Sequence, residues 1–154
     1  MDNVPNSLPF TRKVWVAYGI FLVYTAMWYG AAFLFRFPTR EITFWMVAIT
    51  MMAAHIYYVI QAFASTGGHN YLDLLVNFAQ CGATMILITG HLAGTIGPHA
   101  SLWLVAAVAA GHPLLTDFHH IRRYFRTDVA GYVPPACILV DFSGAAFALV
   151  ALAL

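Results

Sequence analysis

The sequence carries very little charge. Only 8% of its 154 residues are Asp, Glu, Lys or Arg and 62% are hydrophobic, whereas a soluble domain carries about 25% charged residues. A chain this poor in charge is predicted to be an integral membrane protein, with the lipid bilayer as its main partner. Its formal net charge is only +1, so it lacks the basic surface that nucleic acid requires, and no nucleic-acid partner is expected.

Cysteine is also scarce. Cys81 and Cys137 are the two cysteines, both lie in apolar stretches, and neither belongs to a CxxC pair. Buried free thiols are therefore expected in preference to a disulfide or a metal ligand. The N-terminus lacks a cleavable signal pattern, and the first apolar run is long enough to span a bilayer, so no processing is expected.

Five apolar runs are each long enough to cross a bilayer as a helix. They predict an all-α integral membrane protein: a five-transmembrane-helix bundle with short loops, forming one transmembrane domain over residues 1–154. The third and fourth runs are separated by a very short turn at Gly97–His99, which predicts antiparallel neighbours. The predicted helices cover about residues 14–35, 42–64, 72–96, 100–125 and 136–154.

Basic residues predict the orientation of the bundle. A cytoplasmic N-terminus places most of them on the inner side, namely Arg12, Lys13, Arg122, Arg123 and Arg126, and leaves Arg36 and Arg40 outside. This bias predicts a cytoplasmic N-terminus and, after five spans, an outside C-terminus. Small residues such as Gly90 and Gly94 permit close helix contacts within the bundle or between subunits, so other membrane subunits or self-association are expected.

The third run carries a polar stripe. Its members lie within roughly 40° of one line along a helix, and they are Asp73, Asn77, Gln80, Thr84 and His91. Unpaired polar groups are costly in lipid, so the stripe is predicted to face protein or a water-filled path. Leu87 is expected to lie on a lipid-facing side of this helix.

Polar residues of the other runs fall at matching depths. His55 and His112 are both expected near the middle of the membrane. Pro113 frees a helical carbonyl beside His112, and the small residues before it leave space for a cofactor or water. A second group is expected nearer the inner face, and it comprises Asp73, His119, His120 and Asp141.

The histidines are candidates for cofactor binding. Neutral imidazoles at matched depth on facing helices can ligate a haem or related macrocycle, so His55, His112 and His91 are the candidate cofactor-binding residues. A packing role with hydrogen-bonded side chains remains open for His55 and His112.

The inner group is a candidate metal site. Histidine nitrogen and carboxylate oxygen suit a transition-metal ion such as zinc, iron or manganese, so the candidate ligands are Asp73, His119, His120 and Asp141. His119 and His120 point about 100° apart on a helix, which disfavours one ion taking both. A proton-carrying or quinone-binding pocket is the alternative for this group.

The sequence favours a small multi-pass membrane subunit of a redox or electron-transfer assembly. Such a subunit would bind a haem-like cofactor or a quinone through its intramembrane histidines. The alternatives are a metal-dependent membrane enzyme acting on a lipid-soluble substrate, a proton-coupled transporter or channel, and a purely structural subunit. The sequence leaves open whether the protein is an enzyme and which residues would be catalytic.

Overall fold

A computed structural model describes residues 11–65, 71–125 and 127–154. Arg126, which contributes to the predicted charge bias, lies outside the described residues. Within them, five helical spans are long and apolar enough to cross a membrane, which confirms the predicted all-α membrane bundle. The spans are α1 (Arg12–Phe35), α2 (Thr39–Ala64), α3 (Tyr71–Leu92), a composite fourth span of α4 (Pro98–His112), η1 (Pro113–Asp117) and α5 (Phe118–Ile121), and α6 (Val133–Ala153).

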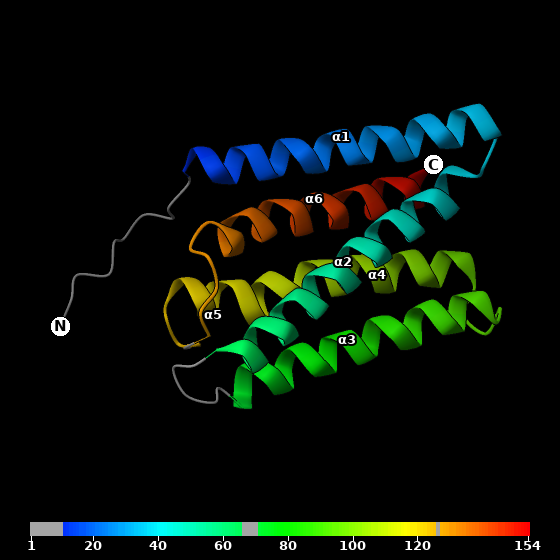
Figure 1. Cartoon of the computed structure of the whole chain (residues 1–154). Helices are drawn as coiled ribbons and strands as arrows, with labels where there is room; N and C mark the ends of the chain where they lie inside the picture. The colour runs from blue at the N-terminus through cyan, green and yellow to red at the C-terminus, as the bar shows by residue number, and fades with distance from the viewer. Residues whose placement is uncertain (1–10, 66–70, 126) are drawn as a thin grey trace.

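Helix α2 is the centre of the bundle. It packs against α1, α3, α4 and α6, whereas α1 packs, among the described helices, only against α2 and α6. Figure 1 shows the same arrangement, with α1 and α3 at opposite edges and the remaining spans between them. Helices α3 and α4 are in contact, as their short connection predicts. Polar groups on the facing sides of α2, α4 and α6 are therefore the ones that meet inside the protein.

Three helix ends differ from the predicted boundaries, and the residues at these ends show why. Helix α3 ends at Leu92 and not at residue 96, because the chain turns at Gly94, which has a φ of +70°. The fourth span ends at Ile121 and not at residue 125, and Arg123 follows with a φ of +57°. Helix α6 begins earlier than predicted, at Val133, because Pro134 fits the first turn of a helix.

The core is built from tightly packed apolar side chains and small residues. Ala109, Ala145 and Ala148 let α4 and α6 approach α2, and a Cβ added at Gly144 would stand 3.4 Å from Val47. Close packing of this kind holds membrane helices together, since lipid and core are equally apolar. Leu87 belongs to this core and is only 4% exposed, so the expectation that it faces lipid is wrong. At 14 residues from Asp73 it falls about 40° from the line of the stripe, which points inward.

The two ends of the bundle differ in charge. Because successive spans run in opposite directions (Figure 1), the start of α1 and the end of α5 lie at one end of the bundle. This basic end carries Arg12, Lys13, Arg122 and Arg123, and the opposite end carries Arg36 and Arg40.

Candidate functional site

The fourth span contains a wide helical turn at mid-length. Proline has no N–H to continue the α-helical pattern, and the segment Pro113–Asp117 is a π-helix. At its end the N–H of Phe118 donates to the carbonyl of Pro113, five residues earlier. A π turn takes in an extra residue, so Asp117, five residues after His112, comes round to the face that His112 occupies.

Three ligating side chains meet in the centre of the bundle. His112 from α4, Asp117 from η1 and Asp141 from α6 are each at most 1% exposed. His112 Nδ1 lies 2.7 Å from Asp141 Oδ2 and 3.6 Å from Asp117 Oδ2. One nitrogen or oxygen from each residue lies within 4.8 Å of the others. We call these three residues the midplane cluster.

Further polar side chains of α2 and α3 surround the midplane cluster. The Tyr58 hydroxyl donates to Asp117 Oδ1 over 2.6 Å. The His55 ring meets His112 edge to face, with centroids 4.8 Å apart, so the two histidines are in contact as their matched depth predicts. Thr84 Oγ1 lies 3.3 Å from His55 Nδ1 and donates its own proton to a backbone carbonyl. His55 Nδ1 is therefore assigned as the protonated nitrogen, which leaves a lone pair on Nε2.

Four buried atoms around the cluster have no hydrogen-bond partner among the described residues. They are His55 Nε2, His112 Nε2, Asp117 Oδ2 and Asp141 Oδ1. A buried polar atom without a partner costs free energy, and a bound ion or water would remove that cost. These atoms make the midplane cluster a candidate for binding an ion or water.

The two carboxyl groups of the cluster have no lysine or arginine partner among the described residues. Within the described residues, the ion pairs of Asp117 and Asp141 are both with His112 and none is with Lys or Arg. Two carboxylates removed from water need protons or a cation to compensate them. The cluster is therefore suited to a proton or to a positively charged ligand.

The predicted inner metal group does not form as one cluster. Asp141 lies against His112, because α6 begins at Val133 and Asp141 is then eight residues, about 12 Å, along it. His119 is partly buried and stacks on Phe125, with ring centroids 5.1 Å apart. His120 stays with Asp73, since its Nε2 lies 3.3 Å from Asp73 Oδ1.

The carboxylate of Asp73 is well satisfied. It accepts hydrogen bonds from the Asn77 amide, over 2.8 Å, and from the Thr127 hydroxyl. His120 also stacks on Tyr58, with centroids 4.9 Å apart. This inner group therefore ties the start of α3 to α5 and to the segment after it, and Tyr58 joins it to the midplane cluster.

His91 lies at the opposite end of the bundle from these groups. Its Nε2 is 2.9 Å from Glu41 Oε1, its Nδ1 is 2.9 Å from Ser101 Oγ, and its ring stacks on Phe44. Trp45 donates to the same Glu41 oxygen over 2.6 Å. Both ring nitrogens are therefore engaged, and the contacts fasten α3 to α2 and α4. The structure does not bring His91 together with His55 and His112.

The remaining members of the α3 stripe point inward, as predicted. Asp73, Asn77 and Thr84 are fully buried, and Gln80 Oε1 accepts a hydrogen bond from Thr116 over 3.3 Å. Asp117 and Tyr58 were not among the residues predicted from the sequence. Tyr58 could have been found from its place three residues after His55, one turn along the same face.

These contacts define a multi-pass membrane bundle with histidine and carboxylate side chains buried at its centre. Comparisons with protein-family models, with curated proteins and with solved structures gave no match. A function for this chain must therefore be argued from the chemistry of the midplane cluster.

Proposed function

We propose that the protein is a metal-dependent membrane enzyme acting on a lipid-soluble substrate. His112, Asp117 and Asp141 hold a divalent transition-metal ion in this proposal. The observation that carries it is the meeting of three ligating atoms within 4.8 Å of one another, all buried. One imidazole and two carboxylates form a donor set that suits zinc, iron or manganese.

Small side-chain movements would let the residues that now form hydrogen bonds coordinate a metal ion. Ligand atoms about 2.1 Å from a tetrahedral ion lie about 3.4 Å apart. The His112–Asp117 distance of 3.6 Å is close to this value, whereas the His112–Asp141 distance of 2.7 Å is that of a hydrogen bond. The ion would replace the proton between His112 and Asp141. A dication with two carboxylates and a neutral imidazole has no net charge, which suits burial at this depth.

Neighbouring side chains support the ligand set. His55 Nε2 has no hydrogen-bond partner among the described residues, so it is available as a fourth ligand or as a proton acceptor. The Tyr58 hydroxyl orients Asp117 through its 2.6 Å hydrogen bond, as outer residues commonly do for metal ligands.

A cavity on the membrane spans supports a lipid-soluble substrate. An apolar cavity of about 500 Å³ lies between α3 and the fourth span, and its lining includes Gln80, Val108 and Gly111. Gly111 in its lining directly precedes the buried His112 in the sequence, and the cavity lies on two of the membrane spans. A molecule that reaches the cluster this way must be lipid-soluble, and the ion would polarise an oxygen atom of the molecule or of a water.

A haem between His55 and His112, which the sequence favours, receives less support. Ligation by both histidines requires iron and macrocycle to lie between the two imidazoles. The rings are in edge-to-face contact at 4.8 Å, so α2 and α4 would have to separate. A single ion at the midplane cluster requires only side-chain shifts.

Metal analysis of the purified protein tests the proposal. After incubation with zinc, manganese or ferrous iron and removal of excess metal, we expect about one ion per chain, measured by elemental mass spectrometry. Asp141→Asn removes a ligand charge and should lower the metal affinity at least tenfold. Asp73→Asn is the matched control, because Asp73 is equally buried outside the midplane cluster, and it should keep the ion. A wild-type chain that retains none of these metals contradicts the proposal.

A proton-coupled transporter is the second candidate function. Polar contacts continue from Thr127 and Asp73 through His120, Tyr58 and Asp117 to the midplane cluster. Beyond Thr84, however, apolar core residues separate this path from the Glu41–His91 pair. Proton flux into liposomes that contain the protein, reported by a pH-sensitive dye, distinguishes the two candidates. Flux without bound metal would favour transport.

A further inference from the structure

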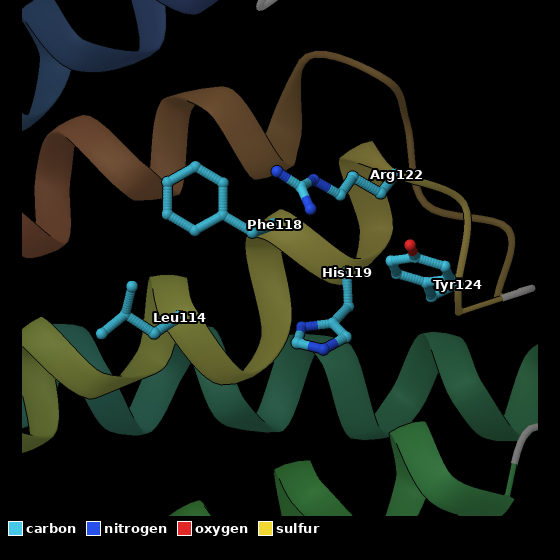
Figure 2. Close-up of a pocket in the computed structure, with 5 residues that line it drawn as sticks. All are labelled: Leu114, Phe118, His119, Arg122 and Tyr124. Atoms are coloured by element: carbon cyan, nitrogen blue, oxygen red, sulfur yellow. The ribbon is translucent and has the colours of Figure 1, made fainter. Parts of the chain in front are cut away.

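A pocket of about 250 Å³ lies at the basic end of the bundle, and the midplane cluster plays no part in it. Figure 2 shows its five lining side chains, which come from η1, α5 and the residues after α5. Leu114 and Phe118 supply an apolar side, whereas His119, Arg122 and Tyr124 supply polar groups.

The pocket changes from apolar to cationic along the membrane normal. From Leu114 to Arg122 the helical chain rises about 12 Å, so Leu114 lies toward the membrane centre and Arg122 lies at the end of the span. The chain then reverses at Arg123, and the Tyr124 N–H donates to the His119 carbonyl over 2.8 Å. This reversal brings the Tyr124 ring beside His119 (Figure 2).

Two polar side chains of the pocket have groups available to bind a ligand. The Arg122 guanidinium forms no ion pair within the described residues, and His119 Nδ1 is buried without a hydrogen-bond partner there. Leu114 is 58% exposed and Tyr124 is 67% exposed, so both the apolar and the polar side can be reached from outside. The pocket therefore offers an accessible apolar wall beside a cation that has no ion pair in the described part of the chain.

The surrounding charge favours an anion. The described part of this end has four basic residues, Arg12, Lys13, Arg122 and Arg123, and two acidic residues, Asp73 and Asp128. Asp73 does not line the pocket, and its carboxylate is engaged by Asn77 and Thr127. Basic residues at the end of a membrane helix attract anionic lipid headgroups.

We propose that this pocket binds an anionic phospholipid. Its phosphate lies between the Arg122 guanidinium and the Tyr124 hydroxyl, with His119 beside it, and one acyl chain lies along Phe118 and Leu114. An amphipathic lipid matches both halves of the pocket, whereas a free phosphate would leave the apolar half unused. This site is independent of the metal proposed at the midplane cluster.

Lipid binding to the full chain in detergent tests this proposal. We expect phosphatidylglycerol to bind more tightly than phosphatidylcholine of the same chain length, measured by native mass spectrometry. Arg122→Gln should weaken phosphatidylglycerol binding about fivefold, the effect of one interfacial basic residue. Arg123→Gln is the matched control, because it removes the same charge from the next residue, which does not line the pocket, and its effect should be below twofold.

Three results would overturn the proposal. Equal losses from Arg122→Gln and Arg123→Gln would indicate unspecific attraction to the basic end. Equal affinity for the two lipids would remove the role of the headgroup charge. Displacement of phosphatidylglycerol by millimolar inorganic phosphate would show an anion site without a lipid requirement. Metal content, measured on the same samples, should not change in either variant. Failure of the lipid proposal can therefore be distinguished from failure of the metal proposal.

Discussion

Tyr58 is the residue that joins the two polar groups of the bundle. Its hydroxyl donates to Asp117 over 2.6 Å, while its ring stacks on His120. The side chain is fully buried, so no water replaces a lost contact. A hydrogen bond to a carboxylate in such surroundings both stabilises the fold and holds the carboxylate in one orientation.

Tyr58→Phe should therefore lower both stability and metal affinity. Loss of the buried hydrogen bond should reduce the free energy of unfolding by about 1 kcal/mol, measured by denaturation in mixed micelles. Metal affinity should fall about tenfold, as for other groups that orient a ligand. Tyr57→Phe is the control, because the neighbouring Tyr57 hydroxyl makes no hydrogen bond within the described residues. Equal effects of the two changes would contradict the role given to Tyr58.

At the scale of the element, the π turn determines which side chains the fourth span presents. Thr116 and Asp117 are both fully buried, which a regular α-helix through His112 would not allow for Asp117. Five residues of α-helix rotate about 140° past one turn, so Asp117 would leave the face of His112. The turn begins at Pro113, the residue that prevents the regular pattern.

Pro113→Ala should weaken metal binding without unfolding the protein. Alanine restores the missing N–H and favours a regular helix, which rotates Asp117 away from His112 and Asp141. We expect metal affinity to fall about tenfold, measured by competition with a chromophoric chelator. Pro98→Ala is the matched control, because Pro98 opens α4, where proline is tolerated. Unchanged metal affinity in Pro113→Ala would show that the turn does not depend on Pro113.

At the scale of the whole molecule, charge is distributed unequally between the two ends. The basic end carries Arg12, Lys13, Arg122 and Arg123, and the opposite end carries Arg36 and Arg40. Arg40 donates to the Ala151 carbonyl over 3.2 Å, so part of the charge at the opposite end is tied to the C-terminal end of α6. The difference favours the basic end on the cytoplasmic side.

Reporter fusions should show a cytoplasmic N-terminus and an outside C-terminus. Alkaline phosphatase fused after Leu154 should be active, because it folds outside, and a fluorescent protein fused before Met1 should fluoresce inside. An odd number of spans requires the ends to differ in location. Replacing Arg36 and Arg40 by Gln should strengthen the preference for a cytoplasmic N-terminus. A result with both ends on one side of the membrane would contradict the predicted topology.

The sequence by itself determined the spans and much of what faces inward. Five apolar runs of bilayer length are local features, so the all-α membrane bundle could be predicted from composition and length alone. The α3 stripe follows from helical phase within one element. His55 and His112 could be placed at the same depth from the positions of their spans in the sequence, and the two rings are in contact.

The tertiary structure alone decided the membership of the candidate site. Asp117 belongs to the candidate site because the π turn after Pro113 rotates the following residues about the helix axis. A projection that assumes a regular α-helix does not include this rotation. Asp141 joins it because α6 starts three residues before the predicted position, which changes its depth. His91 leaves it because Glu41 and Ser101 engage both ring nitrogens. A shift of a few residues in where a helix starts or in how it winds changes little along that helix. It changes the direction and the depth of each side chain, and these decide which side chains of neighbouring helices meet.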